Sequence, residues 1–134
     1  MSSTLAAYVA DLAALTVTGV TRSYSAPPVQ INTADLPCMY PRLPQLADNP
    51  ITACGQGGWP IHTAELVIMV EPLGQNLQPT NFAAVLTLID NLQAALQADR
   101  PTTGKRTWQI RQEIVEHKPD TLHWAIIATV TGPA

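Results

Sequence analysis

Charged side chains are scarce in this sequence. They make up 13% of its 134 residues, about half of the ~25% that is usual in soluble domains. The net charge is −3, and the seven basic residues are scattered, apart from a small group between Arg100 and Arg111. Autonomous nucleic-acid-binding domains usually carry a basic stripe, so that class is disfavoured. So little charge instead favours a surface that is buried against other subunits.

Cysteine is also rare, and long apolar runs are missing. Cys38 and Cys54 are the only two cysteines, and one pair is a poor disulfide framework for a chain of this size, so we expect reduced thiols in a cytosolic protein. No run approaches the ~18–20 apolar residues of a membrane span. The N-terminus lacks a basic region and contains Asp11, so no signal peptide is expected. We expect no membrane partner.

Proline is abundant in the charge-poor middle of the chain. Between Ser23 and Ala64 there are seven prolines but only three formal charges. Proline removes a backbone donor and disrupts helices and central strands, so this stretch cannot be one regular element. It is nevertheless too apolar for a typical disordered linker. We interpret residues 25–63 as an irregular arm that lies on another subunit, and its expected contact residues are Tyr40, Arg42, Leu43, Ile51, Trp59 and Ile61.

Two segments have helical periodicity. The first begins after a serine cap at position 2 or 3 and runs to residue 15 or 16, with apolar residues three and four apart. The second begins at residue 80 or 81 and ends at Asp99, because the next residue precedes a proline. Its expected buried stripe consists of Phe82, Val85, Leu86, Ile89, Leu92 and Leu96.

Alternating apolar residues predict the strands. Clear strands are expected at 64–71, 108–115 and 123–130, a short one at 20–24, and an edge strand at 36–43, where the prolines exclude a central position. The last two long strands form an antiparallel hairpin around Lys118-Pro119-Asp120-Thr121. The order predicts a single small α+β domain: a mixed, mostly antiparallel sheet of about four strands, two helices on one face and the other face free.

The sequence offers few candidates for chemistry. Cys54 and His62 allow a cysteine-nucleophile hypothesis, but such pairs have no fixed local spacing. His117 and His123 flank the expected turn and could share a metal, although a third ligand of convincing spacing is missing. Exposed strand-end histidines are the plainer interpretation. We therefore predict no catalytic, cofactor-binding or metal-binding residues, and no cofactor.

Three other features have plain structural interpretations. The glycines at 55–58 are followed by Trp59 and a strand, whereas a phosphate-binding loop leads into a helix. Glu65 and Glu71 share one strand face, as do Glu113 and Arg111, and both faces are expected to be solvated. Trp108 and Trp124 belong to the core, and Trp59 is a candidate anchor for a partner.

The order of elements and several local phrases resemble a known family. These are VTGVTRSYSAPP, LPCMYPRLP, GGWPIHTAELVIMVEPLGQ, NFAAVLTLIDNLQAAL and the closing WQIRQ and HWAIIATVTG strands. They resemble the tail terminator, or tail-completion, proteins of long-tailed bacteriophages, and next the neck proteins of the head–tail joint. The resemblance spans nearly the whole chain, but it includes no residue motif that can be transferred position by position.

The resemblance implies a virion protein that is assembled in the host cytoplasm. It would form a ring, commonly a hexamer, that caps the tail tube, stops its polymerisation and joins it to the head. Its partners would be its own copies, the tube protein, a neck or connector protein, and DNA that passes through the lumen without specific binding. Three alternatives stay open: a head-side adaptor or stopper, a small thiol- or metal-dependent enzyme, and a monomeric ligand-binding module that uses the tryptophans.

Overall fold

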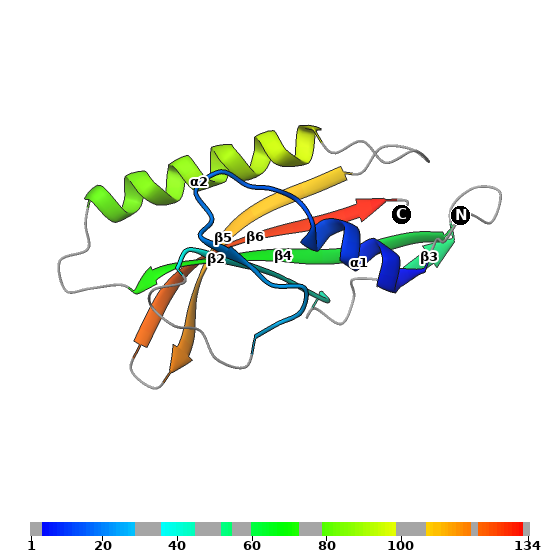
Figure 1. The fold of residues 1–134 in the computed structure, drawn as a ribbon, viewed down its shortest axis with the longest axis horizontal. Helices are drawn as coiled ribbons and strands as arrows, with labels where there is room; N and C mark the ends of the chain where they lie inside the picture. The colour runs from blue at the N-terminus through cyan, green and yellow to red at the C-terminus, as the bar shows by residue number, and fades with distance from the viewer. Residues whose placement is uncertain are drawn as a thin grey trace.

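Two helices pack on one face of a mixed sheet (Figure 1). A computed structural model describes residues 4–28, 36–44, 52–54, 60–72, 79–98, 107–118 and 121–132. The predicted α+β class is confirmed, although the sheet contains six strands rather than about four.

The central strand of the sheet is β4 (Pro60–Pro72), and it carries apolar residues on both of its faces. Its order is β1-β2-β4-β6-β5, and β3 also pairs with β4. β1 and β2 are parallel, and all the other described pairs are antiparallel. The remaining strands are β1 (Arg22–Ser23), β2 (Cys38–Arg42), β3 (Thr52–Cys54), β5 (Thr107–Lys118) and β6 (Thr121–Gly132).

The predicted hairpin is confirmed as β5 and β6. Trp108 lies opposite Val130 and Ile114 lies opposite Trp124, so the apolar residues of both strands share a face. The two central residues of the expected turn, 119 and 120, lie outside the described residues. β6 pairs with β4 on its other side, which places the hairpin at one end of the sheet.

The first helix, α1 (Leu5–Ala13), begins with a threonine cap. The Thr4 hydroxyl accepts a hydrogen bond from the Ala7 amide at 3.2 Å. This differs from the predicted serine cap, whose candidates at positions 2 and 3 lie outside the described residues. Tyr8 and Leu12 are fully buried, because the helix presents one narrow apolar stripe to β2 and β4.

The second helix, α2 (Pro79–Ala98), buries a narrower stripe than predicted. Phe82 is 54% exposed and Leu86 is 46% exposed, so their assignment to the buried stripe is wrong. A helix that rests on a sheet covers only a sector of its circumference, and these two residues lie beside it. The residues that α2 buries are Val85, Leu88, Leu92 and Leu96.

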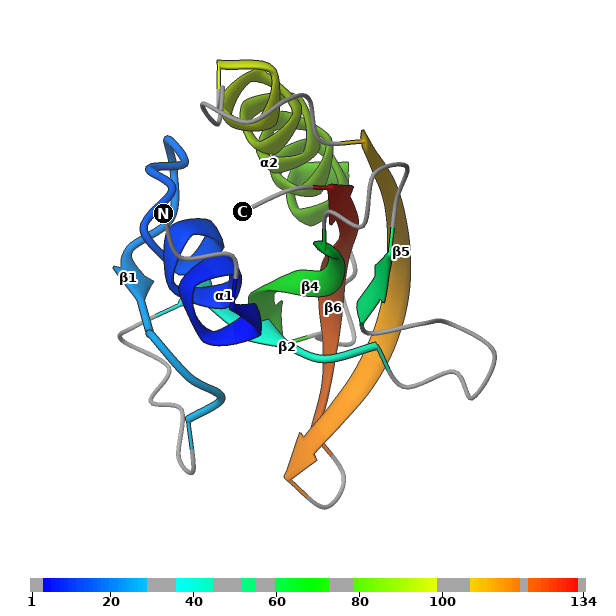
Figure 2. The same cartoon turned by 90° about the vertical axis from the view of Figure 1, so that its right-hand side faces the viewer.

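One core joins both helices to the sheet. It contains Tyr8 and Leu12 from α1, Leu92 from α2, and Leu66 and Ile126 from β4 and β6. Figure 2 shows α1 and α2 on the same side of the curved sheet, with α1 above β2 and α2 nearer to β6 and β5.

The proline-rich middle contains strands, so the expectation of an irregular arm does not hold for its described residues. β2, β3 and the start of β4 all fall between residues 25 and 63. β2 lies between β1 and β4, which corrects the prediction of an edge strand. Pro41 is tolerated there because β1 pairs only with Cys38 and Met39, so the strand is an edge at Pro41.

The face of the sheet opposite the helices was expected to be free, and this is wrong. Val67 and Ile127 are fully buried on that face, and Glu65 is only 1% exposed. Both faces of β4 are therefore buried, which agrees with the apolar residues on both of its faces.

Candidate interaction surfaces

The predicted contact residues that the structure describes lie on both faces of the sheet, with Tyr40 opposite the helices and Leu43 beside α1. Tyr40 is half-buried and packs against two small clusters on the face opposite the helices. Burial raises the pKa of its hydroxyl, although the nearby Arg42 charge opposes this. Ile61 is half-buried in β4, whereas Leu43 is 43% exposed. Ile51 and Trp59 lie outside the residues whose surroundings are described.

Arg42, one of the predicted contact residues, forms an ion pair with Glu65 of its own chain. Its Nε donates to Glu65 Oε1 at 2.8 Å, directly across the β2–β4 ladder. Arg111 donates from Nη2 to Glu65 Oε2 at 2.9 Å and from Nη1 to the Thr129 hydroxyl at 2.8 Å. Arg111 Nε also pairs with Glu113 at 3.0 Å. This network connects β2, β4, β6 and β5 on one face.

The electrostatics of Glu65 follow from this network. Burial opposes its ionisation, but hydrogen bonds and charges from Arg42 and Arg111 outweigh that effect and hold the pKa of Glu65 below its ordinary 4.5. Burial also opposes the charge of Arg111, yet Glu65 and Glu113 raise its pKa. The prediction that Glu65 lies on a solvated face is wrong. The sequence did contain a signal, because its neighbours on that strand face, Val67 and Met69, are apolar.

An apolar groove lies beside α1. Leu5, Ala6 and Val9 form its helical wall, and Pro41 and Leu43 form the wall opposite. Its volume is about 770 Å³. Ala6 is exposed and Leu43 is among the exposed large apolar residues, so the groove is open to solvent. Groove walls of this composition suit an apolar side chain of another molecule.

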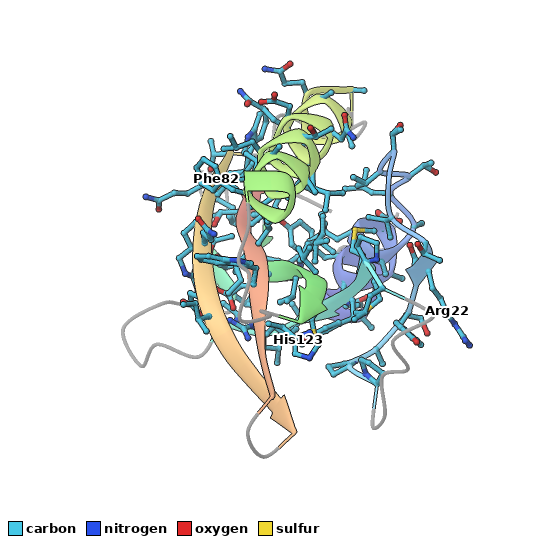
Figure 3. All side chains as sticks on the ribbon, turned by 90° about the vertical axis from the view of Figure 1, so that its left-hand side faces the viewer. Arg22, Phe82 and His123 are labelled. Carbon is cyan, nitrogen blue, oxygen red and sulfur yellow. The ribbon has the colours of Figure 1, made fainter. Side chains whose placement is uncertain are left out.

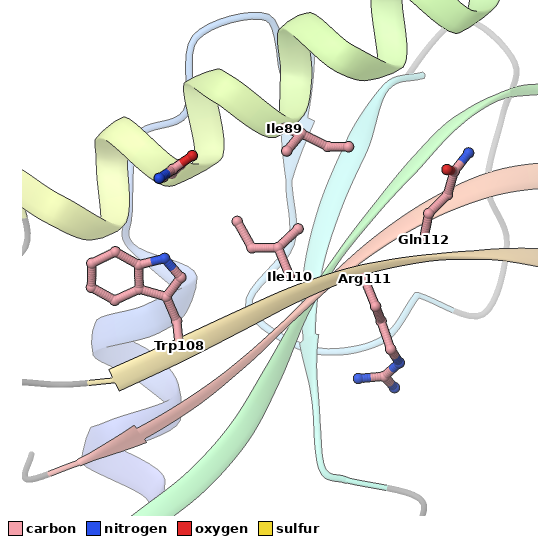
Figure 4. Close-up of a pocket in the computed structure, with 6 residues that line it drawn as sticks. Ile89, Trp108, Ile110, Arg111 and Gln112 are labelled. Atoms are coloured by element: carbon pink, nitrogen blue, oxygen red, sulfur yellow. The ribbon is translucent and has the colours of Figure 1, made fainter.

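A second apolar surface lies on α2. Phe82 and Leu86 are one helical turn apart and both are about half exposed. Beside it, a hollow of about 400 Å³ separates α2 from β5 and is lined by Ile89, Trp108 and Ile110. Figure 4 shows these side chains between the helix and the strand, with Arg111 pointing to the opposite face.

The two surfaces belong to different sides of the molecule. The groove involves α1 and β2, near the β1 end of the sheet, whereas α2 overhangs the β6–β5 end. Phe82 and Arg22 of β1 mark these sides in Figure 3.

The described histidines are buried rather than exposed. His62 is 2% exposed, contacts Tyr8 with ring centroids 5.4 Å apart, and shares a 3.1 Å hydrogen bond with Thr52. His123 is 4% exposed and donates from Nδ1 to the Val70 carbonyl at 3.0 Å. The expectation of an exposed His123 is therefore wrong.

The chemistry hypotheses depend partly on side chains that are not described. The side chains of Cys54 and His117 lie outside the description. The thiol hypothesis (Cys54 with His62) and the metal hypothesis (His117 with His123) therefore fall outside the described residues. Across the described ranges, no group of three or more His, Cys, Asp or Glu residues is arranged to hold a metal ion. Cys38 is a buried thiol in β2.

Comparisons with protein-family models, curated proteins and solved structures found no match to this chain. Neither helix in the described ranges has both the length and the hydrophobicity needed to cross a membrane.

Proposed function

We propose that this protein is a structural component of a tailed-bacteriophage virion, a tail terminator that assembles into a ring at the end of the tail tube. The ring ends tube polymerisation and provides a docking face for the connector of the head. DNA passes through its lumen without specific binding. The protein acts by shape complementarity and turns over no substrate.

The observation that carries this proposal is the pair of different apolar surfaces near the two ends of the sheet. In a cyclic ring, every copy uses one patch to contact one neighbour and a different patch to contact the other. The groove beside α1 is concave, and Phe82 and Leu86 project from α2. A concave and a convex surface on one chain support head-to-tail association. The tail assignment itself comes from the sequence resemblance.

Substitution of the groove wall tests the ring. Ala6→Arg places a long charged side chain on the exposed helical wall of the groove. We expect this variant to lose the ring while it keeps its fold, because position 6 is exposed. The measurements are native mass spectrometry and negative-stain electron microscopy, with circular dichroism to verify folding.

Ala94→Arg is the matched control, since Ala94 is also an exposed helical alanine but lies away from the groove. The control should still form rings. If Ala6→Arg assembles like the wild type, the groove is not a subunit contact. Binding of the purified protein to isolated tails, rather than to DNA-filled heads, tests the terminator role against a head-side neck role.

A further inference from the structure

β5 (Thr107–Lys118) is a long open edge of the sheet. β6 pairs with one side of it from Thr107 to Lys118, and no described strand pairs with the other side. The other end of the sheet is blunted, because β1 has two residues and β2 contains Pro41. A long strand with one unpaired side is a template for pairing with another chain.

The residues of β5 are complementary to themselves. Along an edge strand, every second residue points its backbone N–H and C=O groups away from the sheet. In an antiparallel pair, two residues of this kind must lie opposite each other. For two identical strands, the twofold axis therefore passes through a residue and not between two residues. With the axis at Gln112, Arg111 lies opposite Glu113 of the second copy, and Ile110 lies opposite Ile114. Regular pairing then runs from Trp108 to Glu116, with Trp108 opposite Glu116 of the second copy, because β5 has a register shift between Glu116 and Lys118.

Neighbouring registers lose this complementarity. An axis at Arg111 sets two arginines opposite each other, and an axis at Glu113 does the same with two glutamates. Like charges directly opposite are destabilising, whereas opposite charges and apolar pairs are stabilising. The charge pattern therefore selects one register.

The side chains on this edge are available for such a contact. Ile114 is 53% exposed, and Gln112 is also exposed. The side chains of Arg111 and Glu113 are 37% and 42% exposed. Arg111 uses three of its donors within the chain, and a guanidinium has five. A second carboxylate across the axis would extend the existing network.

We propose that two copies of this chain pair antiparallel through their β5 edges, around a twofold axis at Gln112, and form one continuous sheet in the free protein. This contact goes beyond the proposed ring, since it uses the edge of β5 instead of the α1 groove. It covers the open edge before the protein joins a tail.

Cysteine crosslinking tests the register. Gln112→Cys places two cysteines directly opposite each other, and we expect most of the protein to form a disulfide-linked dimer under a mild oxidant. Gln109→Cys is the matched control on the same strand, and its two copies would be six residues apart along the strand, about 20 Å. Wild-type protein shows what the native cysteines contribute. The proposal is overturned if Gln112→Cys fails to crosslink, or if Gln109→Cys crosslinks equally well.

A second variant tests the contact without crosslinking. Ile114→Lys removes both symmetric pairs of Ile114 with Ile110, so the dimer dissociation constant should rise about tenfold. Ala94→Lys is the control, because Ala94 is also exposed but lies on α2, outside β5 and outside the groove. Analytical ultracentrifugation of the Ala6→Arg protein with each substitution separates this contact from the ring. Equal dimer stability in both variants would contradict the β5 contact, whatever the outcome for the ring.

Discussion

Glu65 shows how a single residue constrains this fold. Its carboxylate is buried at 1% exposure, and it is stabilised because Arg42 and Arg111 approach its two oxygens. Removing one member of a buried ion pair is costly, since the remaining charges stay buried without compensation. Arg42 is 15% exposed and depends on Glu65 most, whereas Arg111 is 37% exposed and also pairs with Glu113.

Replacing Glu65 should therefore lower stability in a pH-dependent way. We expect Glu65→Gln to reduce the free energy of unfolding by about 3 kcal/mol at pH 7. The pKa of Glu65 is held below 4.5 in the folded state, so its contribution is fully present above that pH and is lost as the pH falls through the lower folded value. The difference in stability between the wild type and the variant should therefore shrink as the pH falls below 4.5, as measured by urea unfolding.

Glu113→Gln is the control for this prediction. Its side chain is 42% exposed, and exposed ion pairs contribute about 1 kcal/mol or less. A difference in stability between wild type and Glu65→Gln that does not shrink as the pH falls below 4.5 would contradict this account of Glu65.

At the scale of elements, periodicity predicted most of the fold. The hairpin, β4 and both helices follow from apolar spacing, because local pattern and tertiary burial agree there. β2 was predicted as an edge strand because of its prolines. A proline destabilises a strand only where a neighbouring strand needs its backbone N–H, and β1 does not pair with Pro41. The sequence does not show which residues of β2 have a neighbouring strand. The partner of Arg42 was missed for the same reason, since Glu65 is distant in sequence and opposite only in the sheet.

The candidate surfaces were predicted less well than the strands. Phe82 and Leu86 were wrongly assigned to the buried side of α2, because the sequence does not show how much of the helix surface the sheet covers. Leu43, which was predicted as a contact residue, is 43% exposed. The groove beside it could not be predicted, because it forms only when α1 packs beside β2.

Truncation of two neighbouring leucines measures which side of α2 is buried. Leu88 is 5% exposed and Leu86 is 46% exposed. We expect Leu88→Ala to lower the free energy of unfolding by about 2–4 kcal/mol, because it leaves a cavity in the core. Leu86→Ala should cost about 0.5 kcal/mol or less, as surface substitutions usually do. The comparison needs a concentration low enough to keep the protein dissociated, and equal losses would contradict this arrangement of α2.

At the scale of the whole molecule, the ion pairs of Glu65 with Arg42 and Arg111 connect the strands that lie between the α1 groove and the apolar surface of α2. Arg42 lies next to Leu43 at the groove, and Arg111 lies on β5 next to the α2 side. Both arginines bind Glu65 in the centre of the sheet. In the proposed ring, a rigid sheet between the two apolar surfaces would fix the angle between neighbouring subunits, and a fixed angle is what closes a ring.

The mass and shape of the purified wild-type protein test the ring most directly. Light scattering over a range of concentrations, combined with electron microscopy, measures both. The account predicts particles with an open centre and a mass that is a multiple of the 14.4 kDa subunit. Monomers of 14.4 kDa at every concentration, or dimers without any open-centred particle, would contradict it.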